Sequence, residues 1–404
     1  MPVNLSPPTT LLPVNGVELA TVAAGIRYQE RDDLVLITLC EGTRVAAVFT
    51  QNKCCAAPVI VAKQHLAQAE TRALLINSGN ANAVTGEQGL SDAMLSCERV
   101  ASSLEIKANQ VLPFSTGVIG EPLNMAALLS GVDYAVPRLA ADEWLSAASG
   151  IMTTDTVPKG ISVVIQINGQ DVTITGISKG SGMICPNMAT MLAYVVTDAD
   201  IAQGDLESLL SAATQKSFNR ITVDSDTSTN DALVLAATGR SATGHLSSEE
   251  ELDSFSSALE EVLVHLATAI IRDGEGATKF VSIEVLGGLK EEDCRTIAYD
   301  IAHSPLVKTA LYASDPNWGR ILMALGKSSV DSLEMAKVDI FINGVALIEH
   351  GQPASSYSEE AGQAVFQQEE ITISINLNTG ASCFNVWTSD LSHDYVSINA
   401  DYRS

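Results

Sequence analysis

The stretch that organises this chain is Lys179-Gly-Ser-Gly-Met-Ile-Cys-Pro-Asn-Met-Ala-Thr-Met-Leu-Ala-Tyr-Val-Val196. Its first part is rich in glycine and contains Pro186, a composition typical of loops. Its second part, from Met191 to Val196, is an apolar run containing the aromatic and β-branched residues that favour strands. The pattern therefore predicts an irregular loop that ends abruptly at Thr190, where a strand begins.

Thr190 has two interpretations, and the spacing alone leaves both open. A threonine at the start of a strand is usually there because β-branched residues favour strands. Alternatively, the chain is cut before Thr190, which gives this residue a free α-amine beside its own hydroxyl. An α-amine with an ordinary pKa of about 7.7–8.0 is a base near neutral pH. One residue would then supply both the nucleophile and the general base, and no histidine would be required.

The residues on either side of this stretch predict further strands and hairpins. Asn-Gly turns predict hairpins at 161–177, around Asn168-Gly169, and at 338–348, around Asn343-Gly344. Further strands are predicted at 34–39 and 45–50, which flank a turn-sized gap, at 72–76, which runs into a polar loop at 77–82, and at 280–286. A third hairpin is predicted from 370–377 and 383–388.

Helical spacing predicts helices at 91–104, 141–148, 203–216, 247–271 and 291–303. Strands and helices are mixed, with several hairpins and few strict β-α-β alternations. This arrangement favours the α/β class in a layered α+β form with a substantial antiparallel sheet.

The composition excludes several classes of protein. The chain of 404 residues carries 23 Lys and Arg against 48 Asp and Glu, a net charge of −25 that repels nucleic-acid phosphates. Hydrophobic residues make up 46%, so the acidity does not indicate disorder. The length predicts about two or three domains, or one large one. No apolar run is long enough to span a membrane, and the N-terminus does not resemble a secretory signal.

The cysteines and histidines predict neither disulfides nor a metal site. The seven cysteines include no C-x-x-C pair, so we interpret them as reduced thiols in a cytoplasmic protein. The six histidines are scattered, so we expect no metal.

Two short motifs match known active-site patterns but lack the neighbouring residues that those patterns require. Gly176-Ile-Ser-Lys-Gly180 matches the G-x-S-x-G nucleophile elbow of esterases, but the residues that follow cannot start the required helix. Gly326-Lys-Ser328 matches the end of a phosphate-binding loop, but Ile321 stands where the upstream glycine is required.

The loop resembles the self-cleavage region of the ornithine acetyltransferase/glutamate N-acetyltransferase (ArgJ) family through Lys179-Gly-Ser-Gly-Met-Ile184 and Pro186-Asn-Met-Ala-Thr-Met-Leu192. Eight further motifs resemble the same family in order along the chain: Asn77-Ser-Gly-Asn-Ala-Asn-Ala83, Ser115-Thr-Gly-Val-Ile-Gly120, Met152-Thr-Thr-Asp155, Thr229-Asn-Asp231, Asp273-Gly-Glu-Gly-Ala-Thr-Lys279, Ser304-Pro-Leu-Val-Lys-Thr-Ala310, Asp315-Pro-Asn-Trp-Gly-Arg320 and Ile398-Asn-Ala-Asp-Tyr-Arg-Ser404.

The resemblance implies a DmpA/ArgJ-like fold and a self-processed enzyme of the N-terminal-nucleophile type. The precursor would cut itself between Ala189 and Thr190 into an α chain, 1–189, and a β chain, 190–404, which stay together as an α2β2 heterotetramer. Thr190 would take the acetyl group of N2-acetyl-L-ornithine and pass it to L-glutamate in a ping-pong cycle of arginine biosynthesis. No cofactor is implied, although acetyl-CoA is a possible second donor.

The resemblance also assigns residues. Thr116 and Gly117 would form the oxyanion hole, and Gly117 lacks the Cβ that would keep a ligand from the backbone. Substrate contacts would come from Thr153, Lys179, Thr190, Glu275, Asn399 and Ser404. We expect Lys179 to face the substrate carboxylate and Glu275 its side-chain amine. Without the resemblance, Lys179 and Glu275 would be interpreted as solvated surface charges, and Ser115-Thr-Gly117 as an ordinary turn. Thr154 is an alternative to Thr153.

Two other functions remain open at this point. An amide hydrolase or aminopeptidase could use the same self-processed threonine, with water instead of glutamate as the acceptor. A non-catalytic binding protein descended from such an enzyme would not cut itself. Glutamate-dependent consumption of acetylornithine separates the first alternative from the acetyltransferase, and self-cleavage separates the second.

Overall fold

A computed structural model describes residues 2–185 and 191–401, which divide into two compact units. One unit comprises residues 6–219 and 227–270, and the other comprises residues 1–5, 220–226 and 271–404. We call them the larger and the smaller unit and describe each by itself. The cut expected between residues 189 and 190 falls inside the larger unit, so the expected α and β chains do not coincide with the two units.

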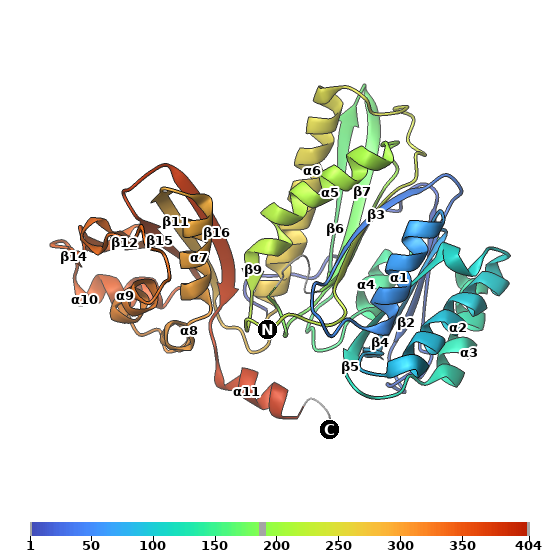
Figure 1. Ribbon diagram of the computed structural model, residues 1–404, viewed down its shortest axis with the longest axis horizontal. Coiled ribbons are helices and arrows are strands. Elements are labelled where there is room, and N and C mark those ends of the chain that lie inside the picture. Colours follow the sequence, from blue (N-terminus) through green and yellow to red (C-terminus); the bar gives the residue numbers. More distant parts are fainter. Residues whose placement is uncertain (1, 186–190, 402–404) are drawn as a thin grey trace. The chain divides into compact units, whose positions relative to one another are not determined.

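The larger unit contains a four-stranded sheet with helices on its outer face (Figure 1). The strands in spatial order are β1 (Val17–Val22), β2 (Leu34–Leu39), β4 (Ala73–Asn80) and β5 (Val111–Val118). Helices α1 (Ala57–Gln68), α2 (Gly86–Leu104) and α3 (Met125–Ala135) cover this sheet. β2 is apolar and buried along almost its whole length, as expected of a strand that is covered on both faces.

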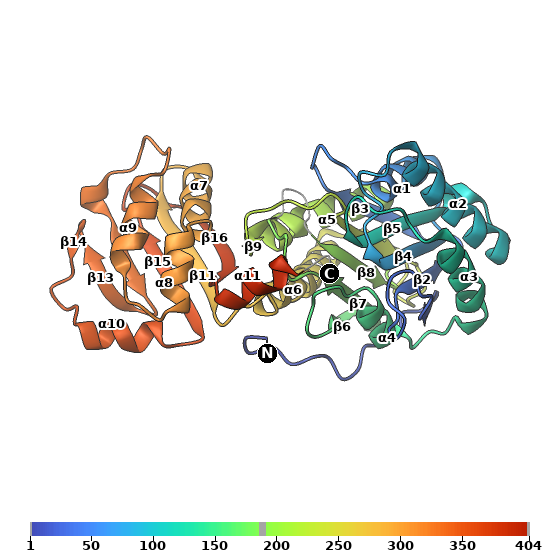
Figure 2. The same ribbon diagram turned by 90° about the horizontal axis from the view of Figure 1, so that it is seen from below.

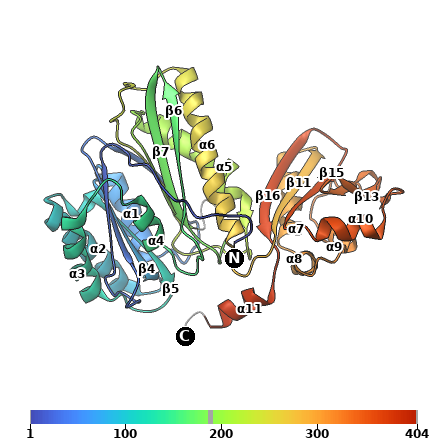
Figure 3. The same cartoon turned by 180° about the vertical axis from the view of Figure 1, so that it is seen from behind.

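A five-stranded mixed sheet is the second layer of the larger unit. Its strands in order are β3 (Arg44–Phe49), β10 (Ala232–Ala237), β8 (Leu192–Thr197), β7 (Gln170–Lys179) and β6 (Lys159–Ile167). Helix α5 (Gln203–Lys216) packs on β3 and β10, and α6 (Glu249–Arg272) runs along β7 (Figure 3). The inner faces of the two sheets share one core, where the rings of Phe114 and Tyr194 meet edge to face at 5.3 Å. The unit is therefore a helix–sheet–sheet–helix sandwich.

Helix α4 (Trp144–Gly150) contacts strands of both sheets and fills the space between them at one end. Its small residues permit a close fit: a Cβ on Gly150 would lie 2.7 Å from the Thr21 side chain and 2.8 Å from that of Val35. The segment that leaves α4, residues 152–155, is thereby placed beside the end of β7.

The smaller unit has a seven-stranded sheet with helices packed on it (Figure 2). The strands in order are β14 (Gln352–Pro353), β13 (Val345–Glu349), β12 (Asp339–Ile342), β15 (Glu370–Asn376), β11 (Phe280–Gly288), β16 (Ser382–Ser389) and β9 (Ile221–Thr222). The helices are α7 (Glu291–Ala302), α8 (Pro305–Tyr312), α9 (Trp318–Gly326), α10 (Glu359–Phe366) and α11 (His393–Ala400). Short 3-10 turns in the chain lie at Ala108–Gln110, Val136–Arg138, Phe218–Arg220 and Met335–Lys337.

Most of the predicted elements are confirmed, as is the mixed α/β architecture. The two Asn-Gly hairpins form as expected, because Asn168, Gly169, Asn343 and Gly344 all adopt the positive φ that a tight hairpin turn requires. The G-x-S-x-G match lies at the end of β7, inside a strand and followed by a loop, so the rejection of an esterase elbow is also confirmed.

Three local predictions were wrong. β2 and β3 do not pair across their short gap but belong to different sheets. β15 and β16 do not form a hairpin, because β11 lies between them. The segment 77–82 is not wholly a loop, because β4 continues through Asn80 with Asn77 and Ser78 buried and paired to β5. In each case a distant strand provides the partner, and short-range spacing does not reveal it.

Helix α6 is the one helix in the described part of the chain that is long and apolar enough to cross a membrane by length and composition. More than half of its apolar window is buried in the protein. Val262 and Leu266 pack against Gly176 of β7, so its apolar face covers the second sheet. The hydropathy of α6 is therefore that of a core helix.

Candidate functional site

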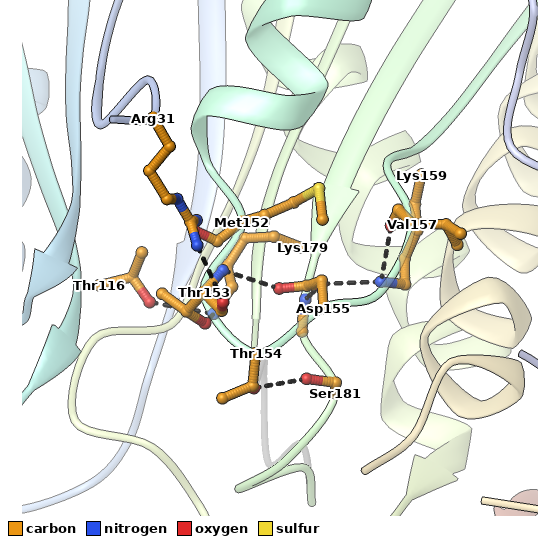
Figure 4. A network of polar contacts seen from close by, with 11 residues as sticks. Arg31, Thr116, Met152, Thr153, Thr154, Asp155, Val157, Lys159, Lys179 and Ser181 are labelled. Carbon is orange, nitrogen blue, oxygen red and sulfur yellow. Dashed lines mark hydrogen bonds and ion pairs between the residues drawn. The ribbon is translucent and has the colours of Figure 1, made fainter. Parts of the chain in front are cut away.

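The ammonium group of Lys179 joins three parts of the larger unit (Figure 4). Its Nζ donates to Thr116 Oγ1 over 3.0 Å and to Thr153 Oγ1 over 2.9 Å. Lys179 is the last residue of β7, Thr116 belongs to β5, and Thr153 follows α4. Lys179 is only 9% exposed, which excludes its interpretation as a solvated surface charge. The structure thus brings together three of the residues that the sequence singled out.

Gly117 is required by the fold itself. Its φ is +131°, and a Cβ at this position would lie 2.2 Å from the carbonyl carbon of Gly79 and 2.5 Å from the backbone nitrogen of Asn80. The sequence analysis explained this glycine by the approach of a ligand. In the structure, the backbone of β4 occupies the space of the absent Cβ. Thr116 and Gly117 lie in β5, so they do not form an ordinary turn.

The segment 153–155 holds the start of the glycine-rich loop. Thr153 contacts Lys179 as described, Thr154 Oγ1 lies 2.7 Å from Ser181 Oγ, and Asp155 Oδ1 accepts the Gly180 backbone N–H over 2.7 Å. Thr153, rather than Thr154, therefore contacts the Lys179 ammonium. Three consecutive residues thus hold the last residue of β7 and the first two residues of the loop.

Arg31 contacts the backbone of the segment 152–155. Its guanidinium donates to the carbonyl oxygens of Met152 and Thr153, and it stacks over the Tyr28 ring at 4.3 Å. The carbonyls at the end of α4 are thereby paired, which orders the backbone that carries Thr153.

Asp155 and Lys159 form a fully buried ion pair. Lys159 Nζ lies 2.7 Å from Asp155 Oδ1, and neither side chain is exposed. Burial acts to raise the pKa of the Asp155 carboxyl, but the Lys159 and Lys179 ammonium groups and the Gly180 N–H outweigh it, so this pKa lies below its ordinary value. Asp155 is therefore ionised at neutral pH.

Asn230 and Asp231 connect β10 with the strand of Thr116. Asn230 Nδ2 donates to Ser115 O over 2.9 Å and to Ala81 O over 2.6 Å. Asp231 is 2% exposed, and its Oδ2 has no hydrogen-bond partner within the described part of the chain. Burial raises the pKa of the Asp231 carboxyl well above its ordinary value, although Ser228 and Lys179 act to lower it.

Glu275 and Asn399 meet in the smaller unit. Asn399 Nδ2, on α11, donates to Glu275 Oε2 over 2.7 Å, and Glu275 is 8% exposed rather than a solvated charge. The turn that carries Glu275 packs on the start of α11, since a Cβ on Gly276 would lie 2.5 Å from Ser392 Oγ and 2.6 Å from the Tyr395 nitrogen. This contact explains why glycine stands at 276.

Three predicted residues, Ala189, Thr190 and Ser404, lie outside the described residues. β8 begins at Leu192, two positions after Thr190, and Leu192 pairs with Lys179 of β7. Met191, just before the strand, accepts the Ala232 N–H through its carbonyl oxygen over 2.9 Å. Lys179 is therefore aligned with Leu192, the third residue after the expected cut.

The sequence analysis did not assign Arg31, Asp155 and Lys159 to the site. The one signal in the sequence was the Met152-Thr-Thr-Asp155 motif, in which only a threonine was assigned a role. The four-residue spacing of Asp155 and Lys159 suggests a helical pair, but the two lie in a loop and at the start of β6. Among the described residues no cluster of three or more His, Cys, Asp or Glu side chains could hold a metal ion.

Comparison with known proteins identifies close relatives. The model of the ArgJ family matches residues 18–404. The chain is 51% identical over 403 residues to the arginine biosynthesis bifunctional protein ArgJ of Psychrobacter arcticus, covering 99% of both chains. It is 50% identical over 406 residues to the protein of the same name from Pseudomonas syringae pv. tomato, covering 100% of both. A solved structure of the Bacillus halodurans ArgJ protein is 41% identical, covers 51% of this chain and 97% of that chain, and has a TM-score of 0.49.

Proposed function

This chain belongs to the ArgJ family, and we propose that it is an acyltransferase of arginine biosynthesis that moves the acetyl group of N2-acetyl-L-ornithine to L-glutamate. The products are L-ornithine and N-acetyl-L-glutamate. The observation that carries the proposal is the match, over 99–100% of the chain at 50–51% sequence identity, to bifunctional ArgJ proteins. The buried Lys179–Thr116 contact supports it, because it brings a cation to the hydroxyl that we assign to the oxyanion hole.

The proposed chemistry is covalent and passes through Thr190. The hydroxyl of Thr190 forms a bond to the acetyl carbon, and the α-amine of the same residue takes the hydroxyl proton. The bond between the acetyl carbon and the ornithine nitrogen breaks, and the α-amine returns the proton to that nitrogen. The glutamate amine then forms a bond to the acetyl carbon and gives a proton to the Thr190 α-amine. The bond from the acetyl carbon to the Thr190 oxygen breaks, and the α-amine returns the proton to that oxygen, which restores the hydroxyl.

The negative oxygen of each tetrahedral intermediate needs nearby donors, which we assign to Thr116 and Gly117. Removal of one such donor typically lowers the rate by about 10²–10³-fold. For the substrate, we assign the positive charge of Lys179 to the carboxylate and the carboxylate of Glu275 to the side-chain amine of ornithine. Thr153, Asn399 and Ser404 complete the proposed contacts.

The free α-amine requires self-cleavage between Ala189 and Thr190. Cleavage there would leave the α and β chains joined within one sheet, because β7 precedes the cut and β8 follows it, and the two are paired from Ile174–Thr197 to Lys179–Leu192. β8 also pairs with β10 along its whole length, and β10 pairs with β3 of the α chain. This interleaving supports association of the two chains, and we propose an α2β2 assembly.

The proposed reaction needs no cofactor. The names of the relatives include the word bifunctional, and we propose acetyl-CoA as a second acetyl donor for this chain. A biosynthetic enzyme that handles these metabolites is expected in the cytoplasm.

The first test compares the wild-type protein with Thr190→Ala. We expect two fragments in the intact mass of the wild type, divided between Ala189 and Thr190, and an uncut variant. We also expect the wild type to consume acetylornithine only when glutamate is present. Consumption without glutamate would favour an amide hydrolase, and an uncut wild type without turnover would favour a binding protein.

A further inference from the structure

The hydrogen bond between Lys179 and Thr116 determines which way the Thr116 hydroxyl can donate. An ammonium group has donors and no acceptor, so Thr116 Oγ1 must accept at 3.0 Å. The proton of that hydroxyl therefore points away from Lys179. A hydroxyl whose oxygen accepts from a cation is also a stronger donor, because hydrogen bonds in a chain polarise one another.

Asp155 keeps Lys179 in the position that this arrangement needs. Its Oδ1 accepts the N–H of Gly180, the residue bonded to Lys179, over 2.7 Å, and its Oδ2 accepts the Thr153 N–H over 3.0 Å. The Thr153 hydroxyl oxygen in turn accepts a hydrogen bond from the Lys179 ammonium. The carboxylate thus fixes the backbone next to Lys179 and the second hydroxyl that its ammonium contacts, and it supplies a fully buried negative charge near that ammonium.

We propose that Asp155 is a positioning residue for acetyl transfer: it holds Lys179 so that the ammonium donates to Thr116, which leaves the Thr116 proton directed at the oxygen that becomes negative. This inference rests on the proposed function and adds a second task to Lys179. Asp155 is fully buried and its oxygens accept from protein groups, so we assign it no contact with the substrate. Its loss should therefore lower kcat and leave the KM for acetylornithine nearly unchanged, whereas loss of a substrate contact raises KM.

The count of buried charges decides which variants are informative. In Asp155→Asn, two lysines are buried without their carboxylate, which is costly. In Lys159→Met, Asp155 still faces Lys179 and the pair is neutral. In Asp155→Asn/Lys159→Met, only Lys179 stays charged. The last two variants share the loss of Lys159 and differ only at Asp155, so their comparison isolates the carboxylate.

The experiment measures kcat and KM for acetylornithine and glutamate, per cleaved and acetylatable β chain, in the wild type and in these three variants. The fraction that becomes acetylated is taken from intact masses. We expect kcat of the double variant to be about 10-fold or more below that of Lys159→Met, with KM for acetylornithine changed less than about twofold, since a misplaced oxyanion donor acts on the transition state. We also expect slower self-cleavage, because Gly180 opens the loop that is cut.

A double-mutant cycle tests whether Asp155 acts on acetyl transfer through Thr116. In a Thr116→Val background, removal of Asp155 should lower kcat little further, because the hydroxyl that Asp155 positions is already absent. The inference is overturned if the double variant cuts and transfers acetyl within about twofold of Lys159→Met, or if the effects of Asp155 and Thr116 are additive. If the wild type itself shows no glutamate-dependent transfer, the proposed function fails instead.

Discussion

The Lys179 ammonium donates to the Thr116 hydroxyl over 3.0 Å, although 63 positions separate the two residues in the chain. The contact joins the end of β7 in one sheet to β5 in the other. It is possible because the two sheets share one core and α4 occupies the space between them at one end. A polar contact at the edge of an apolar sandwich places a cation where little water can screen it.

Lys179→Met should therefore abolish most of the activity. The variant loses the cation that donates to Thr116 and that we assign to the substrate carboxylate, so we expect kcat/KM for acetylornithine to fall by about 10²-fold or more. Steady-state kinetics on cleaved protein provide the measurement. Lys63→Met is the control, since Lys63 contacts the Thr50 carbonyl and the Phe49 ring and we assign it no role in the site. Equal activity of both variants would remove Lys179 from the site.

Gly117→Ala should destabilise the protein more than Gly120→Ala. Both glycines have a positive φ, of 131° and 81°, so an alanine at either position is strained by about 1–3 kcal/mol. A Cβ at 120 meets nothing within 4 Å, whereas a Cβ at 117 meets the backbone of Gly79 at 2.2 Å. Overpacking adds about 1–3 kcal/mol at position 117. Thermal unfolding of the two variants gives the comparison, and a Tm for Gly117→Ala at or above that of Gly120→Ala would contradict it.

Strands and tight turns were predictable from the sequence where the residues themselves favour that backbone conformation. The strand after Thr190 begins at Leu192, and the Asn168-Gly169 turn forms because these residues tolerate positive φ. Pairing between strands was not predictable in the same way. β11 pairs with both β15 and β16, which lie about a hundred positions further along the chain, so the short gap between β15 and β16 suggested a hairpin that does not exist.

Several residues of the candidate site were predictable, but the contacts that hold them in place were not. The family resemblance supplied Thr116, Lys179 and Thr153, and the structure places them in contact. It did not supply Asp155, because the role of this carboxylate depends on burial and on a backbone N–H, neither of which leaves a pattern in the sequence. Both Asp155 and Asp231 are buried near Lys179, and burial raises the pKa of each; only Asp155 also faces the Lys159 ammonium and the Gly180 N–H, so its pKa is lowered whereas that of Asp231 is raised.

Glu275→Gln should weaken the binding of acetylornithine and leave the binding of glutamate nearly unchanged. Glutamate has no side-chain amine, so only the ornithine donor would lose a charged partner. A hydrogen bond to a charged group contributes about 1.5–3 kcal/mol, which corresponds to a KM for acetylornithine raised about 10- to 100-fold. The exposed Glu369→Gln is the control. A rise in both KM values, or in neither, would show that Glu275 does not face the ornithine amine.

Lys308 should make the stability of the protein rise between about pH 8 and pH 10. This lysine is buried, and its Nζ donates to Thr388 Oγ1 over 2.9 Å and to the Ser389 carbonyl. Burial lowers the pKa of Lys308 to about 8 from its ordinary 10.5, although Asp390 and Asp224 act to raise it. Between these two values the unfolded chain binds a proton that the folded chain has released, so the free energy of unfolding increases with pH.

The full effect of Lys308 is of the order of 3 kcal/mol, because each unit of pKa corresponds to about 1.4 kcal/mol. The measurement is urea unfolding of the wild type and of Lys308→Met at pH 7, 8, 9 and 10. Lys308→Met should be less stable on average, since Thr388 and Ser389 lose their donor, but it should lack the rise that the wild type shows. Lys216→Met, which removes an exposed lysine paired with Glu260, controls for general alkaline effects. Parallel pH profiles for the wild type and Lys308→Met would mean that Lys308 keeps its ordinary pKa in the folded protein.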